Sequence, residues 1–280
     1  MEEKKYRQSL HTHCTFCDGK DDPEDVVCAA IEKGFTDIGF SSHGYNQPID
    51  VCSLDDEREI AYIETIRHLK KKYAGRINVW LGIEEDLMGR VYDLAGFDYI
   101  ITSVHFVPSK DGMTPVDYDE ATARKLINES YDGDFLAYAR AYYDEVARIA
   151  SRPEADIVGH VDLLMKYNEA GKMFDFDDPK YLELAFSAID KLIAAGKIFE
   201  VNTGAISRGY RSDPYPHITL LKYIHDHGGR ITLTSDCHDC AKLDCAYPHA
   251  LDIIRSAGFD TVYVFDSGQF LPVSVSRLIV

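Results

Sequence analysis

The sequence predicts an α/β fold and, within that class, a (β/α) barrel in one domain. Eight short apolar runs alternate with helical patterns, and no long linker divides them. The runs are rich in Val, Ile, Leu and Phe without regular polar alternation, which is typical of parallel strands buried on both faces. Polar side chains recur where the runs end, and active sites of such barrels lie at that end of the strands. A doubly wound open sheet is the alternative.

The predicted strands are the apolar runs themselves. In chain order they cover residues 7–13, 36–42, 78–84, 99–104, 156–160, 198–202, 230–235 and 261–265. Seven or eight strands that alternate with helices favour a closed barrel over two separate domains. We therefore expect residues 1–280 to form a single domain.

Helix signals lie between the strands. The first predicted helix has Asp22 as its N-cap and Pro23 at its first position, and it ends near Gly34. Further helices are predicted over residues 55–73, 133–150, 179–195, 218–227 and 248–257. Residues 107–131 are polar and irregular, so we expect a long loop with a short helix there, of the kind that often forms a lid.

The charge of the chain limits its partners. The formal net charge is -17 at pH 7, so neither long nucleic acids nor anionic membranes are expected as partners. No apolar run approaches the roughly 18 residues that a membrane-spanning helix needs. The N-terminal segment lacks the apolar stretch of a signal peptide, which predicts a cytoplasmic location. The aromatic segment 135–143 is a candidate contact of a homodimer.

The seven cysteines include two Cys-x-x-Cys pairs, Cys14 with Cys17 and Cys237 with Cys240. A zinc ribbon places its two pairs tens of residues apart, whereas these pairs lie near opposite ends of the chain. A structural zinc site of four cysteines is therefore disfavoured. We expect reduced thiols that line the mouth of another site, where a nearby cation would make them sensitive to oxidation.

Six of the eleven histidines lie at the ends of predicted strands, together with one glutamate and one aspartate. A barrel would bring these separate strand ends to one place. With an aspartate from the first loop, the candidate metal ligands are His11, His13, Asp18, His43, Glu84, His105, His160, Asp236 and His238. The other five histidines are interpreted as surface or capping residues, and among them His217 lies nearest to a possible substrate loop.

Nine ligands are too many for one tetrahedral ion, so two or three divalent metal ions are expected. His11 and His13 are two positions apart on a strand and therefore face the same way, and Glu84 can bridge two ions. Mixed nitrogen and oxygen ligands suit Zn, Mn or Fe rather than Mg or Cu(I). Such a centre lowers the pKa of a bound water and hydrolyses esters, so a small phosphate monoester is the expected substrate.

The ordered motifs resemble the polymerase-and-histidinol-phosphatase (PHP) superfamily, most closely its histidinol-phosphatase branch. They are HTH, SSHG, GIEED, SVHF, GHVD, EVNT and TSDCHD. The resemblance implies a distorted (β/α)7 TIM-like barrel with a trinuclear metal centre. It also implies a division of the ligands into three sets: His11, His13, Glu84 and Asp236; Glu84, His105 and His160; and Asp18, His43 and His238.

Cationic side chains that would hold phosphate follow later strands. Arg grips phosphate through two hydrogen bonds, whereas relatives of the branch often carry Arg where this chain has Lys166. Asp117 and Asp119 could contact a cationic amine such as that of histidinol, although carboxylates in loops are more often structural. The predicted substrate-binding residues are Lys166, Asn202, Arg208 and Arg211.

The function predicted from these residues and from the resemblance is a metal-dependent phosphoesterase that hydrolyses L-histidinol phosphate in histidine biosynthesis. A hydroxide that bridges the metals would attack phosphorus, and the expected catalytic residues are Glu84, Asp236 and His238. A covalent phosphoenzyme is not expected, because the acidic segment between Cys52 and Arg58 would repel phosphate.

Three alternatives stay open at this point. The first is another phosphoesterase of the superfamily, acting on nucleotides, short oligonucleotides or phosphotyrosine. The second is an amidohydrolase-type barrel that acts on C–N bonds, but such enzymes commonly carry a carboxylated lysine where this chain has Glu84. The third is a metal-binding or polymerase-associated module without catalysis, in which the ligand set is often eroded, whereas all nine positions here hold competent ligands.

Overall fold

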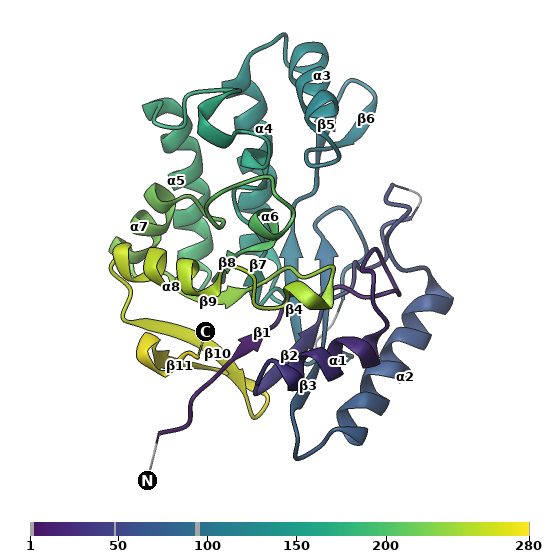
Figure 1. Ribbon diagram of the computed structural model, residues 1–280. Helices are drawn as coiled ribbons and strands as arrows, with labels where there is room; N and C mark the ends of the chain where they lie inside the picture. Colours follow the sequence, from purple (N-terminus) through teal and green to yellow (C-terminus); the bar gives the residue numbers. More distant parts are fainter. Residues whose placement is uncertain (1–2, 48, 93–95, 280) are drawn as a thin grey trace.

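Seven parallel strands form the central sheet of the molecule (Figure 1). The computed structural model describes residues 3–47, 49–92 and 96–279. The strands lie side by side in the order β1-β2-β3-β4-β7-β8-β9, and each neighbouring pair is parallel. Their bounds are β1 Gln8–Ser9, β2 Asp37–Phe40, β3 Asn78–Asp86, β4 Tyr99–Ser103, β7 Ile157–Val158, β8 Ile198–Asn202 and β9 Arg230–Thr234.

The two edges of this sheet meet and close it into a barrel. Thr12, beyond the end of β1, forms a parallel bridge with Cys237, beyond the end of β9. The N–H of His13 donates to the carbonyl of Cys237 at 2.8 Å, and the N–H of Cys237 donates to that of His11 at 3.3 Å. The predicted (β/α)7 barrel is confirmed, and the open sheet is excluded. The barrel is distorted because β1 and β7 are only two residues long.

Helices connect the strands on the outside of the barrel (Figure 1). All six predicted helices are present, as α1 Pro23–Glu32, α2 Asp56–Lys72, α4 Phe135–Arg148, α5 Pro179–Ala194, α7 Ile218–Asp226 and α8 Tyr247–Ser256. Side-chain caps mark the starts of α2 and α4, since Asp55 accepts from the N–H of Arg58 at 2.8 Å and Asp134 from that of Leu136 at 2.8 Å. The predicted N-cap of α1, Asp22, lies at that position, but among the described residues its side chain makes no cap bond. Within the described ranges, no helix combines the length and the apolar character that crossing a membrane requires.

An antiparallel hairpin covers the N-terminal end of the barrel. β10 (Thr261–Asp266) pairs with β11 (Gln269–Ser274), so the eighth predicted strand forms but lies outside the barrel sheet. Phe265 of β10 is buried, and its ring lies 5.0 Å from that of Trp80 and 5.7 Å from that of Tyr99. Both partners lie near the start of their strands, so the hairpin closes the apolar interior at the end opposite the predicted site.

Tyr99 fills the interior of the barrel above this hairpin. Its hydroxyl donates to the carbonyl of Leu10 and lies 3.1 Å from the carbonyl of Phe40, which ties β4 to the first two strands. Two glycines make room for the ring. A Cβ on Gly82 would lie 2.2 Å from Tyr99 Cζ, and a Cβ on Gly39 would lie 2.4 Å from its hydroxyl. Glycine is therefore required where these strands pass the ring.

The segment 107–131 is more regular than the sequence predicts. A hairpin of β5 (Phe106–Ser109) and β6 (Gly112–Pro115) is followed by the 11-residue helix α3 (Glu120–Ser130). The expected long loop is therefore wrong, although the helix was anticipated in shorter form. Each hairpin strand is four residues long and contains a proline, Pro108 or Pro115, so neither carries a clear apolar period. Together these elements stand at the C-terminal end of the barrel (Figure 1).

The aromatic residues of α4 pack within the chain. Tyr138, Tyr142 and Tyr143 are all buried, and the hydroxyl of Tyr143 lies 2.8 Å from that of Tyr181 on α5. Helix α4 thus uses these rings to pack on α5 and the barrel. Their presence in the segment 135–143 therefore does not by itself support the predicted homodimer contact.

Candidate metal centre

Glu84, near the C-terminal end of β3, lies at the middle of the predicted ligands. Its side chain is 1% exposed, and Ser103 Oγ donates to its Oε1 at 2.6 Å. Its two carboxylate oxygens lie 3.1–3.6 Å from ring nitrogens of five histidines, which are His11, His13, His43, His105 and His160. The ends of β1, β2, β4 and β7 therefore converge on one carboxylate of β3.

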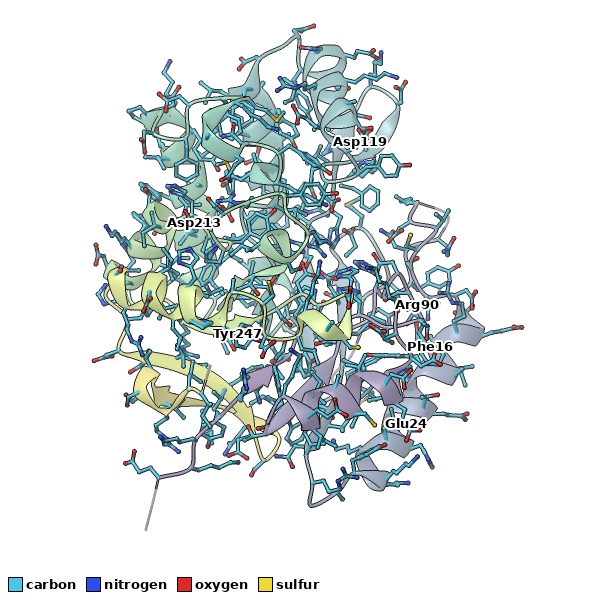
Figure 2. The ribbon with its side chains drawn as sticks, in the orientation of Figure 1. Phe16, Glu24, Arg90, Asp119, Asp213 and Tyr247 are labelled. Carbon is cyan, nitrogen blue, oxygen red and sulfur yellow. The ribbon has the colours of Figure 1, made fainter. Side chains whose placement is uncertain are left out.

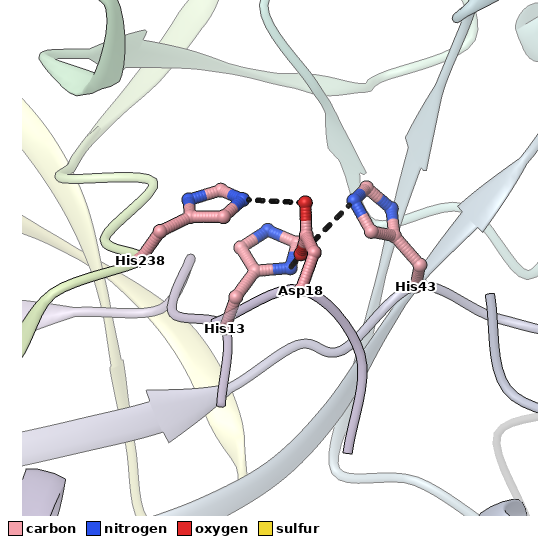
Figure 3. Close-up of side chains that lie close together, drawn as sticks. All are labelled: His13, Asp18, His43 and His238. Atoms are coloured by element: carbon pink, nitrogen blue, oxygen red, sulfur yellow. Dashed lines mark ion pairs between the residues drawn. The ribbon is translucent and has the colours of Figure 1, made fainter. Parts of the chain in front are cut away.

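Metal-competent side chains of the described residues form three overlapping groups, in each of which the ligand atoms lie within 4.8 Å of one another. Figure 3 shows the first group, in which the Asp18 carboxylate lies 3.2–3.6 Å from ring nitrogens of His13, His43 and His238. The other two groups are His11, His13 and Asp236, and His43, Glu84 and His105. These groups follow the predicted division closely, but His13 and His43 each belong to two groups. His160 belongs to none of them and lies 3.2 Å from Glu84 Oε1.

Glycines next to the centre leave room for its acidic side chains. Asp236 follows β9 with φ 45°, in the left-handed region that Asp tolerates better than most residues. A Cβ on Gly204 would lie 2.6 Å from Asp236 Oδ2. A Cβ on Gly159 would lie 2.0 Å from Oγ of Ser103, the hydroxyl that donates to Glu84. The local sequence therefore fits the packing that the ligands require.

The residues of the centre fit divalent cations. Among the described residues, Glu84 Oε2 is buried and has no hydrogen-bond donor, although three imidazoles surround it. A buried carboxylate oxygen without a partner is costly unless a cation neutralises it. The remaining ligand atoms are imidazole nitrogens and carboxylate oxygens, a set that suits Zn, Mn or Fe.

The two buried carboxylates at the centre are held ionised. Burial raises the pKa of Glu84, but neighbouring imidazoles, His11 foremost, outweigh burial and hold that pKa well below its usual value. Burial also raises the pKa of Asp236, and the cations of Arg208 and His11 hold it well below the usual range. Both side chains therefore present negative charge to the cluster at neutral pH.

The imidazoles divide into two kinds. Burial lowers the pKa of His11 and His43, but the carboxylates around them outweigh burial and raise it well above the usual value. For His13 and His238 burial dominates, and the pKa is lowered. In the cluster without metal, some rings thus carry the positive charge that a metal would otherwise supply.

Glu200 of β8 is a site residue that the sequence analysis missed. Its carboxylate accepts from Thr234 Oγ1 at 2.8 Å and from the backbone N–H of His160 at 2.5 Å, and it lies 2.8 Å from His11 Nδ1. Asn202 Nδ2 donates to it at 2.8 Å. A carboxylate that holds the second nitrogen of a ligating imidazole fixes the ring and its tautomer. The sequence feature that could have revealed Glu200 is an acidic residue between apolar residues of a predicted buried strand.

Asp86 has a similar relation to His105. Its Oδ2 accepts from the backbone N–H of His105 at 3.0 Å and lies 3.2 Å from Nδ1 of the same ring. The Nε2 of His105 is thereby left facing Glu84 at 3.6 Å. Asp86 lies two residues after Glu84 on β3, so both belong to the GIEED motif.

A cavity of about 600 Å³ opens over the centre. Its floor includes Asp18, His43, Glu84, His105, His160, Asp236 and His238, so seven of the nine predicted ligands face it. Its rim carries apolar side chains, among them Val51, Tyr118 and Tyr210, which are 79%, 75% and 41% exposed. The arrangement is a charged floor beneath an apolar mouth, as expected for a small-molecule site.

Two of the four predicted substrate-binding residues lie in this cavity. Arg208 donates from Nη2 to Asp236 Oδ2 at 2.9 Å, and its Nη1 lies 2.9 Å from His238 Nδ1. Lys166 Nζ lies 3.1 Å from Asp117 Oδ2. Both cations therefore stand beside the metal groups.

The other two predicted residues do not line the cavity. Asn202 is fully buried and its Oδ1 accepts from the N–H of Gly204 at 2.7 Å, so it supports the turn after β8. Arg211 is 8% exposed and lies over the ring of Tyr215 at 4.9 Å. His217 caps α7, where its Nδ1 accepts from Thr219.

All seven cysteines are free, and none belongs to a metal-competent group of the described residues. Cys14 and Cys237 are buried, and burial raises the pKa of each thiol to about 12. Cys17 Sγ lies 3.3 Å from Nδ1 of His13, and Cys52 lines the mouth of the cavity. A zinc site of four cysteines finds no support, whereas two thiols do lie near the centre.

Comparison with known proteins identifies relatives along almost the whole chain. A "Probable histidinol-phosphatase" of Schizosaccharomyces pombe is 26% identical over 289 residues, covering 93% of this chain and 90% of its own. A histidinol-phosphatase of Bacillus subtilis is 25% identical over 263 residues, covering 86% of this chain and 97% of its own.

Among solved structures, histidinol phosphate phosphatase of Lactococcus lactis, in complex with Zn, L-histidinol and phosphate, shares the fold. It superimposes with a TM-score of 0.66 at 20% identity, over 96% of this chain and 99% of its own. The sequence profile of the PHP domain matches residues 9–204, from the first strand to beyond β8. This match covers more than half of the chain, which therefore belongs to the PHP domain family.

Proposed function

We propose that the protein is a histidinol-phosphatase that hydrolyses L-histidinol phosphate to L-histidinol and phosphate. The observation that carries the proposal is the convergence of eight metal-competent side chains, with His160 beside Glu84 at 3.2 Å, beneath a cavity that also holds Arg208 and Lys166. The names of the curated relatives support it, as does the Lactococcus lactis structure that contains Zn, L-histidinol and phosphate. The apolar rim suits the flat imidazole ring of such a substrate.

The proposed centre holds two or three divalent ions, Zn, Mn or Fe, with the nine ligands divided as the three groups indicate. Bound there, such ions would lower the pKa of a water towards neutrality and offset the charge of the phosphate oxygens. Glu84 would bridge two of the sites through its separate oxygens, since Oε1 faces His160 and Oε2 faces His11.

The side chains around the centre have distinct proposed roles. Arg208, fixed by Asp236 and His238, binds the phosphate oxygens from one side, and Lys166 binds them from another. A water attacks phosphorus in line as the ester P–O bond breaks, and the ionised Asp236 accepts a proton from that water and passes it to the leaving alcohol oxygen. Asp236, Glu84 and His238 are thus the proposed catalytic residues.

Chelation combined with a substrate panel tests the proposed function. Prolonged dialysis against a chelator should abolish phosphate release from L-histidinol phosphate, and added Zn or Mn should restore it. Histidinol phosphate should exceed nucleotides and phosphotyrosine in kcat/KM by at least about tenfold, because binding a matched substrate gains further charged contacts. A rate that chelation leaves unchanged would contradict the metal mechanism, and a better nucleotide substrate would contradict the named substrate.

The seven free cysteines favour a reducing compartment, so we also infer a cytoplasmic location. The partner we propose is the small substrate, and the formal net charge of -17 disfavours a long nucleic acid.

A further inference from the structure

Asp117 is a carboxylate of the cavity that belongs to no metal-competent group of the described chain. Two other lining carboxylates share this property, but each has a local partner. Asp239 pairs with Lys20 at 3.1 Å, and Asp50 accepts from the N–H of Cys52 within its own turn. Asp117 instead faces the interior of the cavity, so its function needs a separate explanation.

The partner of Asp117 in the structure is Lys166. Lys166 Nζ lies 2.7 Å from the Asp117 carbonyl and 3.1 Å from its Oδ2, and the hydroxyl of Tyr167 donates to the same carbonyl at 2.6 Å. Burial raises the pKa of Asp117, but Lys166, His105 and His160 outweigh it and keep that pKa below its usual value. An ionised carboxylate and an ammonium group therefore lie side by side next to the metal groups.

We propose that substrate binding breaks the Asp117–Lys166 ion pair and replaces it with two ion pairs, one from each residue to the substrate. The Lys166 ammonium turns to the phosphate, and the Asp117 carboxylate binds the protonated amine of the same molecule. The cavity then selects 2-aminoalkyl phosphates, in which two carbons separate the amine from the ester oxygen. This inference rests on the proposed function and names the contact by which that site chooses its substrate.

The selection follows from the cost of an unpaired charge. A phosphate ester without an amine would draw Lys166 towards its phosphate and leave Asp117 without a cation in a confined cavity. The Asp117 side chain is 26% exposed, and a carboxylate so largely removed from solvent is disfavoured when it loses its partner. An aminoalkyl phosphate replaces the lost cation with its own. In histidinol phosphate the opposite charges are near neighbours, as they are in the Lys166–Asp117 pair at 3.1 Å.

The test compares L-histidinol phosphate with 3-(imidazol-4-yl)propyl phosphate, which differs from it by the missing amine. The metal-loaded wild-type protein should favour the amine in kcat/KM by about 10- to 100-fold, the range of a charge-assisted contact. In Asp117→Asn this preference should fall to about threefold or less. Most of the change should come from slower hydrolysis of the amine-bearing substrate.

Asp119→Asn is the matched control. Asp119 lies two residues away at the start of α3 and accepts from the N–H of Thr122 at 2.6 Å (Figure 2). It does not line the cavity, and Asn caps a helix as well as Asp does. Asp119→Asn should therefore keep the wild-type preference. An unchanged preference in Asp117→Asn, with normal metal content and thermal midpoint, would overturn the proposal.

Lys166→Gln gives a second measurement that does not depend on the folding of Asp117→Asn. Without Lys166, both substrates should lose at least about tenfold in kcat/KM, while the amine preference should persist or rise because Asp117 has no internal cation. Loss of the preference in Lys166→Gln would contradict the exchange. If the wild-type protein does not hydrolyse histidinol phosphate, the proposed function fails; if it does and both variants keep the wild-type pattern, the exchange alone fails.

Discussion

Glu200 connects two parts of the metal centre that lie on different strands. One of its oxygens holds His11 Nδ1 at 2.8 Å, and the other accepts from the backbone N–H of His160 at 2.5 Å. The first contact orients a ring, and the second positions the strand end that carries another ring. Since the carboxylate does not itself lie in a metal-competent group, its contribution is to position ligands.

Glu200→Gln should weaken metal binding without removing a ligand. The neutral amide loses the anion that faces His11 Nδ1, so the affinity for Zn or Mn should fall by about 10- to 100-fold. Metal titration monitored by phosphate release should reveal this fall, and a large excess of metal should restore most of kcat.

Glu64→Gln, on the exposed surface of α2, is the control and should titrate as the wild type does. A Glu200→Gln variant that binds metal normally but loses kcat would contradict a positioning role.

The sequence indicates which side chains converge at the centre but not the side chains that support them, for a physical reason. Strands buried on both faces are almost wholly apolar, so a histidine where such a run ends is conspicuous. Glu200 lies inside the run IFEVN and Asp86 lies beside Glu84, and what each side chain contacts depends on pairing with distant strands. Arg211 resembled Arg208 in sequence, but the turn after β8 directs it away from the cavity.

At the scale of single elements, β3 and β4 show how little space the interior offers. The ring of Tyr99 on β4 lies over Gly82 on β3, and any side chain there would overlap it. Glu84 follows Gly82 on β3. The strand that packs against the Tyr99 ring is therefore also the strand that carries the central carboxylate.

Gly82→Ala should destabilise the protein by about 1–3 kcal/mol or more, because the new methyl group overpacks the interior. Chemical denaturation measures the change. In a Tyr99→Leu background the same substitution should cost at least about 1 kcal/mol less, because the two residues share one space. Strictly additive effects in this double-mutant cycle would contradict the steric explanation.

Element boundaries were predictable where caps and apolar periods coincide. Asp55 and Asp134 cap helices at the expected positions. The β5–β6 hairpin was missed because its strands have only four residues each and both contain a proline, Pro108 or Pro115. The run 261–265 was predicted as a barrel strand because it is apolar, and Phe265 does pack into the barrel. The run nevertheless pairs with β11, because an apolar run does not reveal its hydrogen-bonding partner.

At the scale of the whole molecule, the centre concentrates charge that must be balanced by protons or by metal. The carboxylates around His11 and His43 raise the pKa of both rings well above the usual value, so in the cluster without metal these rings retain protons at neutral pH. A metal ion binds neutral imidazole, and the protons must leave first.

Metal binding at pH 7 should therefore release protons, and the affinity should fall as the pH is lowered. Calorimetric titration of metal-free protein with Zn or Mn, in buffers of different ionisation enthalpy, should show about two to three protons released per protein, because the pKa is raised for His11, His43 and His105. Equal heats in all buffers would contradict this assignment. The same titration at lower pH should give weaker binding, because protonated imidazoles persist.

The overall architecture could be predicted because it depends on a repeated pattern, whereas the closure of the barrel depends on one contact between distant residues. An alternation of apolar strands with helices along the chain suffices to indicate a parallel sheet. Whether its edges meet is decided by the short bridge between Thr12 and Cys237, which no local pattern reveals.

That bridge also determines the stage of synthesis and folding at which the metal centre can form. His11 and His13 lie far from Asp236 and His238 in the sequence, and the two pairs become neighbours only after β9 docks beside β1. A nascent chain that does not yet include Asp236 and His238 cannot form the complete metal centre. Loading with ions is therefore an event of maturation, and cells that run short of metal should accumulate full-length protein that is folded but inactive.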